Sequence, residues 1–139
     1  MCLLINGNIY PEPTIAKKDI LVYTIRLHYN PTSKTCFSPF YTCFEWEFGK
    51  KYYTEWDENF PKNYFLVHKG FHSFRFKADA EKVRDELLNK YKESNHYVYR
   101  SIVPKDSKYF YGTIVNCSPA ADYRVGYISD TLITTNERL

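Results

Sequence analysis

The sequence predicts an α+β protein with a mainly antiparallel sheet of six to eight strands and one main amphipathic helix at about residues 78–93. Three observations lead to this class. Several short segments alternate between apolar and polar residues with a period of two, which is typical of strands. One longer segment places apolar residues at helical spacing. Aromatic residues make up 19% of the chain, with 14 Tyr and 10 Phe, and such rings favour the pleated surface of a sheet.

The first strong strand signal is DILVYTIRLHY, residues 19–29. Neighbouring residues of a strand point to opposite faces, so the segment splits into two sets. One face carries Leu21, Tyr23, Ile25 and Leu27, and the other carries Ile20, Val22, Thr24, Arg26 and His28. The second face becomes polar toward its end.

Two hairpins are predicted further along the chain. The segment FYTCFEWEFGKKYYTEW alternates and breaks at Gly49, which predicts a turn at Gly49–Lys50 between two strands. The segments HYVYRSIV and KYFYGTIV flank the turn sequence PKDS and give the clearest hairpin pattern. YFLVHK predicts a short strand, YRVGYIS a last strand, and residues 130–139 an edge strand or a tail.

The helix signal lies in KADAEKVRDELLNKYKES. Its apolar stripe consists of Ala80, Val83, Leu87 and Tyr91, and Asp79 is placed to cap the N-terminus or to complement the helix dipole. GFHSF, residues 70–74, precedes the helix and is interpreted as a turn into it, with Phe71 and Phe74 in the core.

The chain shows no repeat, linker or low-complexity tract, so we expect a single domain over residues 1–139. The net charge of +3 is compatible with an anionic partner, but the basic residues are scattered, which argues against sequence-specific nucleic-acid binding. The opening MCLLINGNIY has no basic region and is too short to span a bilayer. We therefore expect a protein of the cytoplasm with no membrane partner.

Metal and catalytic chemistry are weakly supported by the residue pattern. Cys36 and Cys43 are spaced too widely for a zinc knuckle, and the four cysteines are expected to be reduced thiols. His68 and His72 lie four apart in a segment that reads as extended, with no third ligand nearby. No Ser-elbow, HExxH or phosphate-loop motif occurs. The expectation is a protein without metal or cofactor and without catalytic residues.

The residues that do suggest a site are cationic and aromatic. Arginine binds phosphate through its planar fork, and aromatic rings stack on bases. The candidate ligand-binding residues are Tyr23, Arg26, Phe71, His72, Arg75, Lys105, Tyr109 and Tyr111. If their segments adjoin in the sheet, they form a nucleotide-sized pocket. The alternative is that these are exposed charges and core rings.

The order of these segments carries a family resemblance. DILVYTIR, SPF, GKKY, GFHSF followed by ADA, IVPKDSKYFYG and YISDTL follow one another over most of residues 1–135. The chain thereby resembles small uncharacterised proteins of bacteriophages and bacterial mobile elements, which show a GFH turn, an IPKG-x-x-Y hairpin and a closing YxS strand. It departs from them at Asp106, where such a hairpin commonly has glycine. This resemblance implies no established activity.

A second resemblance is to the ADP-ribosyltransferase fold, through VYTIR, GFHSF with ADA, and IVPKDSKY. By position, Arg26 and Ser73 match residues that cradle NAD in that fold. The catalytic glutamate that the resemblance implies near residues 97–101 is not present in YVYRS. Without that carboxylate, the transition state of the transferase reaction would lack its stabilising charge.

Together these observations predict a non-catalytic binding protein of phage or mobile-element origin. The first expectation is capture of a nucleotide-derived anionic small molecule, in the service of counter-defence. A protein–protein inhibitor that docks a tyrosine-rich face on a host enzyme is the alternative, because Tyr and Arg dominate interface hot spots. An ADP-ribosyltransferase-like enzyme is the second alternative. The C-terminal edge strand could also pair across a two-fold axis in a homo-oligomer.

Overall fold

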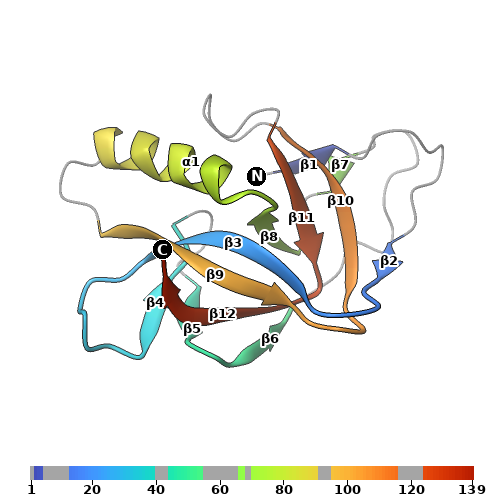
Figure 1. Cartoon of the computed structure of the whole chain (residues 1–139), viewed down its shortest axis with the longest axis horizontal. Coiled ribbons are helices and arrows are strands. Elements are labelled where there is room, and N and C mark those ends of the chain that lie inside the picture. Colours follow the sequence, from blue (N-terminus) through green and yellow to red (C-terminus); the bar gives the residue numbers. More distant parts are fainter. Residues whose placement is uncertain are drawn as a thin grey trace.

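The structure is a computed structural model that describes residues 2–4, 13–39, 44–54, 66–67, 70–90, 95–115 and 124–139. These residues form one helix and twelve strands (Figure 1). The helix is α1 (Lys77–Lys90). The strands are β1 (Cys2–Leu4), β2 (Thr14–Ile15), β3 (Ile20–Leu27), β4 (Thr35–Phe37), β5 (Glu45–Glu47), β6 (Lys51–Tyr53), β7 (Leu66–Val67), β8 (Phe71–Phe74), β9 (His96–Val103), β10 (Lys108–Val115), β11 (Val125–Ser129) and β12 (Thr131–Arg138).

The strands form one antiparallel sheet in the order β6-β12-β9-β3-β8-β11-β10-β1-β7, with β2 paired to β10 and β4 to both β3 and β5. The predicted α+β class with one main helix is confirmed. The strand count exceeds the expected six to eight because β1, β2, β4 and β8, which have only two to four residues each, were not predicted as strands. These four segments show too little alternation for a sequence pattern to detect.

The strand predicted at residues 19–29 is β3, and the helix predicted at about 78–93 is α1. Ala80 and Val83 of the predicted stripe are buried where α1 packs on the sheet. Tyr91 lies outside the described residues. The 14 residues of α1, the helix that the described ranges contain, are too few and too polar to span a membrane.

Both predicted hairpins are wrong in their pairing, although their turns exist. β9 pairs with β3 and β12, while β10 pairs with β11, β1 and β2. The chain does turn after β9, where the Ser107 amide donates to the Pro104 carbonyl and Asp106 has a φ of 72°. Asp tolerates this conformation better than most residues, so it takes the place of a turn glycine. Both edges of β9 are occupied, which leaves β10 to pair elsewhere.

The turn at Gly49 likewise does not join two paired strands. Gly49 has a φ of 81°, but β5 pairs with β4 and β6 pairs with β12. The prediction for GFHSF also needs correction, because residues 71–74 form β8, a strand between β3 and β11. Phe74 is buried in the core as expected, and Phe71 is half-buried. Four residues between a glycine turn and a helix gave no strand pattern to detect.

The sheet has a hydrophobic cluster on each face. The helix-side cluster joins Ala80 and Val83 of α1 to Ile25, Phe74, Val98, Phe110, Ile114 and Ile128. The opposite cluster, the Trp46 cluster, consists of Val22, Cys36, Trp46, Val103 and Leu132. In Figure 1, α1 lies above the sheet and β4, β5 and β6 lie below it. Val22 and Ile25 of β3 belong to opposite clusters, as strand alternation requires.

Gly126 of β11 provides a test of this sheet. A Cβ at residue 126 would overlap the Ser73 carbonyl oxygen of the neighbouring strand, which is backbone and cannot move aside. We expect Gly126→Ala to lower the free energy of unfolding by about 3 kcal/mol or more. Gly49→Ala is the control, because nothing lies near its Cβ position and only the φ of 81° is unfavourable, at a cost of about 1–2 kcal/mol. Equal losses in urea unfolding would contradict the close packing of β8 against β11.

Candidate functional site

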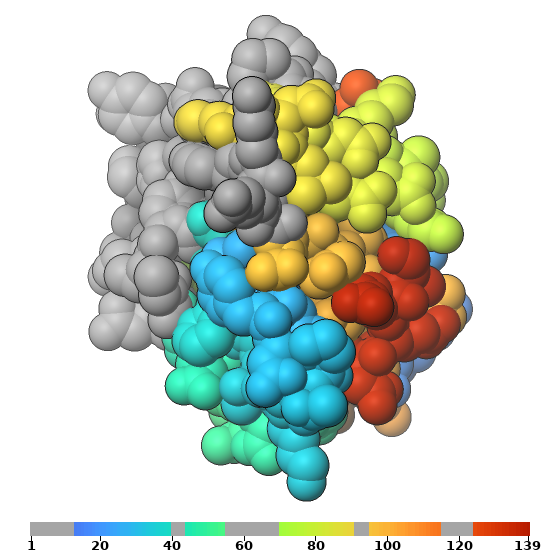
Figure 2. All heavy atoms as spheres, turned by 90° about the vertical axis from the view of Figure 1, so that its left-hand side faces the viewer, coloured from blue at the N-terminus to red at the C-terminus, as the bar shows by residue number. Residues whose placement is uncertain are grey.

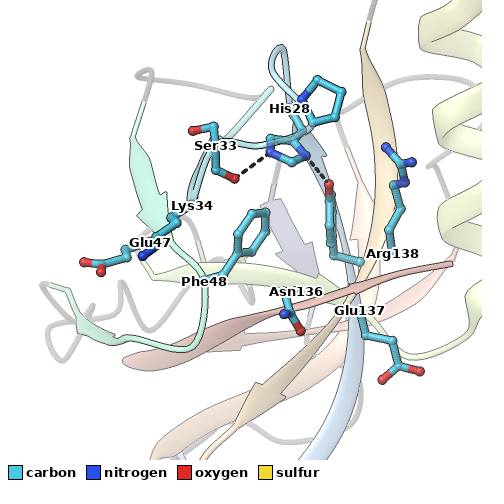
Figure 3. A pocket seen from close by; sticks show the side chains of 10 residues that line it. His28, Ser33, Lys34, Glu47, Phe48, Asn136, Glu137 and Arg138 are labelled. Atoms are coloured by element: carbon cyan, nitrogen blue, oxygen red, sulfur yellow. Dashed lines mark hydrogen bonds between the residues drawn. The ribbon is translucent and has the colours of Figure 1, made fainter.

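A pocket of about 740 Å³ opens where β3, β5, β9 and β12 end near one another (Figure 3). Figure 2 shows the segment that follows β3, in blue, and the C-terminal residues, in red, on one face of the molecule. The pocket is lined by His28, Pro31, Ser33, Lys34, Glu47, Phe48, Tyr99, Asn136, Glu137 and Arg138. None of these residues is among the eight predicted from sequence.

The register of β3 with β9 brings two of these side chains together. Thr24 lies opposite Tyr99, and residues directly opposite in an antiparallel pair share a face. His28 shares that face with Thr24 by strand alternation and follows directly after β3. His28 and Tyr99 therefore meet beneath the pocket.

The floor of the pocket is aromatic, and its polar atoms are already hydrogen-bonded. The Nε2 of His28 lies 3.0 Å from the Ser33 carbonyl oxygen. Because a carbonyl only accepts, Nε2 carries the hydrogen and donates it. Nδ1 of His28 then accepts from the Tyr99 hydroxyl at 2.9 Å, as the dashed lines in Figure 3 show. The ring of Phe48 lies 5.3 Å from the His28 ring and 5.2 Å from the Tyr99 ring.

Tyr99 is a neutral phenol at physiological pH. Burial raises the pKa of Tyr99 to about 12, and the charge and hydrogen bond of Arg138 offset only part of that rise. Tyr99 therefore offers a ligand its ring and a neutral hydroxyl, not a phenolate.

The rim of the pocket is polar and exposed. Pro31, Lys34, Glu47, Asn136, Glu137 and Arg138 form it. The carboxylate of Glu137 forms an ion pair with Arg100, whose Nε lies 3.7 Å away. Lys34 and Arg138 have no carboxylate at ion-pair distance within the part of the chain that the structure describes. The rim thus presents two cations that are available to an anion.

The six arginines of the chain fall into two groups. Three pair with carboxylates: Arg84 with Asp85 at 3.0 Å, Arg100 with Glu137 at 3.7 Å and Arg124 with Asp79 at 3.4 Å. The other three lie over aromatic rings: Arg26 at 4.5 Å from the Trp46 centroid, Arg75 at 5.1 Å and 5.4 Å from Phe76 and Tyr111, and Arg138 at 4.2 Å from Tyr97. Rings orient a guanidinium without neutralising it, so these three side chains keep their positive charge.

Arg26 is the buried member of the second group, with 5% of its surface exposed. Its Nε donates to Thr134 Oγ1 at 3.3 Å, and Nη1 donates to the Ile25 carbonyl at 3.0 Å. Burial lowers the pKa of Arg26 to about 10, so the side chain remains charged near pH 7. Arg26 shares its face of β3 with His28, but it does not line the pocket.

Three of the predicted residues do come together: Arg75, directly after β8, and Tyr109 and Tyr111 of β10. The Nη1 of Arg75 donates to the Tyr111 hydroxyl at 2.7 Å, and the Tyr111 and Tyr109 rings lie 5.0 Å and 5.7 Å from the Tyr127 ring. The side chains of Arg75, Tyr109, Tyr111 and Tyr127 form what we call the Arg75–tyrosine surface. Phe71 faces the same side of the sheet and packs on Trp46 at 4.8 Å.

The remaining predicted residues lie apart from these. Tyr23 packs against the helix-side cluster, on the face of β3 opposite Arg26. His72 lies on the face of β8 opposite Phe71. Lys105 is exposed in the turn after β9, where its amide donates to Asp19 Oδ1 at 2.8 Å. The eight candidates are therefore distributed over both faces of the sheet and do not form one site.

Two of the pocket residues that were not predicted, His28 and Tyr99, lie in segments that the sequence had identified as strands. Alternation had placed His28 beside Arg26, and the strand pattern of residues 96–103 had included Tyr99. Nothing in the sequence indicated that Arg138, at the end of an expected edge strand or tail, would reach the end of β3.

Metal chemistry gains no support from the described residues, in which no three His, Cys, Asp or Glu side chains form a cluster that could hold an ion. Cys36 is fully buried, and burial raises the pKa of its thiol to about 11. Cys43 and His68 lie outside the described residues.

Replacing Arg26 by an uncharged residue tests whether its guanidinium has an acidic partner. Met preserves much of the packing on Trp46, so we expect Arg26→Met to leave the free energy of unfolding unchanged or to raise it by about 1 kcal/mol. Arg26→Ala loses the packing as well and should lower that free energy by about 2–5 kcal/mol. Urea unfolding followed by tryptophan fluorescence measures both. An equal, large loss in the Met variant would indicate a buried acidic partner for Arg26.

The comparisons with known proteins add no assignment to this geometry. Searches against protein-family models, curated protein sequences and solved structures give no significant match for this chain. Its function must therefore be argued from the site itself.

Proposed function

We propose that this protein is a non-catalytic binding protein that captures an anionic, nucleotide-derived small molecule in the pocket between His28 and Arg138. One observation carries the proposal: a pocket with an aromatic floor has a rim on which Lys34 and Arg138 lack carboxylate partners within the described residues. A flat ring would lie on the floor while a phosphate meets the guanidinium of Arg138.

The size and lining of the pocket support a small molecule. Ligand pockets commonly have volumes of about 300–1,000 Å³ and combine aromatic walls with a few polar groups. A volume of about 740 Å³ is within that range. Because every polar atom of the His28–Tyr99 floor has a partner, binding a ring there leaves no buried donor or acceptor unsatisfied.

The charges near the pocket support an anion. Arg138 offers a planar fork that is already oriented by Tyr97, which reduces the entropy lost when phosphate binds. The buried Arg26, two residues before His28 in the chain, adds positive charge to this side of the sheet, and no described carboxylate pairs with it. Glu137 does not oppose this potential strongly, because Arg100 is its partner.

The same lining supports binding over catalysis. His28 uses both ring nitrogens in hydrogen bonds within the protein, so it is not placed to take a proton from a ligand. The high pKa of Tyr99 makes its phenolate unavailable near pH 7. A protein with this lining holds its ligand unchanged.

The resemblance to small phage and mobile-element proteins extends the proposal to a biological setting. In that setting the protein acts in the cytoplasm of the host cell and lowers the free concentration of a nucleotide-derived signal used by host defence.

Arg138→Ala tests the pocket directly. Loss of a charged hydrogen bond costs about 1.5–3 kcal/mol, so the affinity for adenosine 5′-monophosphate should fall by roughly tenfold to a hundredfold. Isothermal titration calorimetry at low salt measures it. Arg84→Ala is the matched control, because Arg84 lies on α1 and pairs with Asp85. Equal affinities of the two variants would exclude Arg138 from the site.

A second function, docking on a host protein, is favoured by the Arg75–tyrosine surface. Arg75 is exposed, it is oriented by Tyr111, and within the described residues it has no carboxylate partner. Tyr and Arg side chains in this arrangement are frequent interface anchors.

The two functions are separated by a quantitative pull-down from host lysate with three baits. If docking is the function, a host protein retained by the wild type is retained by Arg138→Ala and lost by Arg75→Ala. We expect at least a tenfold loss, since a hot-spot arginine contributes about 2 kcal/mol or more. Retention of every captured protein by the Arg75→Ala bait would contradict docking through this surface.

A further inference from the structure

The two available cations of the rim come from separate elements on opposite sides of the pocket. Lys34 belongs to the loop that leads into β4, and Arg138 is the last residue of β12. Figure 3 shows Lys34 on one side of the Phe48 ring and Arg138 on the other. A phosphate bound at one of them is therefore separated from the other by the aromatic floor.

The acidic residues of the rim leave both cations available. Glu137 is paired with Arg100 at 3.7 Å. Glu47 lies on the Lys34 side, but the two side chains form no ion pair in the structure, and both are exposed. Glu47 consequently disfavours an anion next to Lys34 without neutralising Lys34.

The two cations also differ in how they hold an anion. Arg138 is fixed over Tyr97 and can bind phosphate through two parallel hydrogen bonds. Lys34 is a point charge on a flexible stem, so it can adjust to a second group whose position varies. A fixed anchor at one end and an adjustable one at the other suit a ligand with two acidic groups.

We propose that the pocket takes a nucleoside that carries two phosphate groups at separate positions, one held by Arg138 and the other by Lys34. This inference rests on the proposed function, because it specifies the ligand of the same pocket. A ligand with a single phosphate would use Arg138 and leave Lys34 unengaged. The volume of about 740 Å³ accommodates a body that reaches across the floor between the two cations.

The test compares adenosine 5′-monophosphate with adenosine 3′,5′-bisphosphate by isothermal titration calorimetry at one low ionic strength. We expect the bisphosphate to bind at least tenfold more tightly to the wild type. Lys34→Ala should remove most of that advantage while changing the affinity for the monophosphate less than twofold. Lys34→Arg should retain the advantage. Lys82→Ala, an exposed lysine of α1 away from the pocket, is the matched control and should behave as the wild type.

A substitution at Glu47 should change the affinity for the bisphosphate in the opposite direction to Lys34→Ala. Glu47→Gln removes the negative charge beside Lys34 without removing volume, so the bisphosphate should bind about two- to fivefold more tightly, while the monophosphate is little affected. Because Lys34, Glu47 and Lys82 are exposed, these variants should fold, and circular dichroism verifies it.

Two results would overturn the inference in distinguishable ways. Equal affinities for the two nucleotides, or an equal loss of both in Lys34→Ala, would contradict a second phosphate site while leaving a single-anion pocket intact. Failure of both nucleotides to bind at millimolar concentration would contradict the proposed function itself and this inference with it.

Discussion

The eight-residue pairing of β3 with β9 is the constraint on which the rest of the structure depends. The register runs without interruption from Ile20 opposite Val103 to Leu27 opposite His96. A buried hydrogen bond of 2.8 Å between the Thr24 and Ser101 hydroxyls lies within it. A slip by one residue would exchange every side chain between the helix-side cluster and the Trp46 cluster. The same register places Tyr99 beneath His28, so the pocket floor is a consequence of the pairing that separates the two cores.

A second theme is the use of aromatic rings to hold arginines. Arg26, Arg75 and Arg138 lie over rings where the other three arginines have carboxylates. A cation over a ring gains about 0.5–2 kcal/mol, less than burial of a charge costs, so the arrangement at Arg26 is not explained by stability alone. It leaves three positive charges on one face of the sheet without a carboxylate partner among the described residues. The high aromatic content of the chain thereby has an electrostatic role in addition to its role in packing.

Trp46 connects the pocket to the Arg75–tyrosine surface. Its ring lies under the guanidinium of Arg26 and against the ring of Phe71, 4.8 Å away. Arg26 shares its face of β3 with the pocket residue His28, and Phe71 shares its side of the sheet with Tyr127. A small molecule in the pocket and a protein on the tyrosines would therefore bind to the same side of the sheet. The distinct arginines of the two regions, Arg138 and Arg75, allow their contributions to be measured separately.

The sequence by itself determined the class, the strand at 19–29, the helix and the burial of Phe74, because periodicity and side-chain size act locally. It also indicated that arginines and tyrosines would matter, and it placed His28 on the face of Arg26. Only the tertiary structure decided which strands pair. A turn such as Pro104–Ser107 reverses the chain but does not select its partner, and β9 was already paired on both edges. The same non-local choice separated Tyr23, His72 and Lys105 from Arg75 and brought Arg138 to His28, since contacts between residues 110 positions apart depend on sheet order and leave no periodic signal in the sequence.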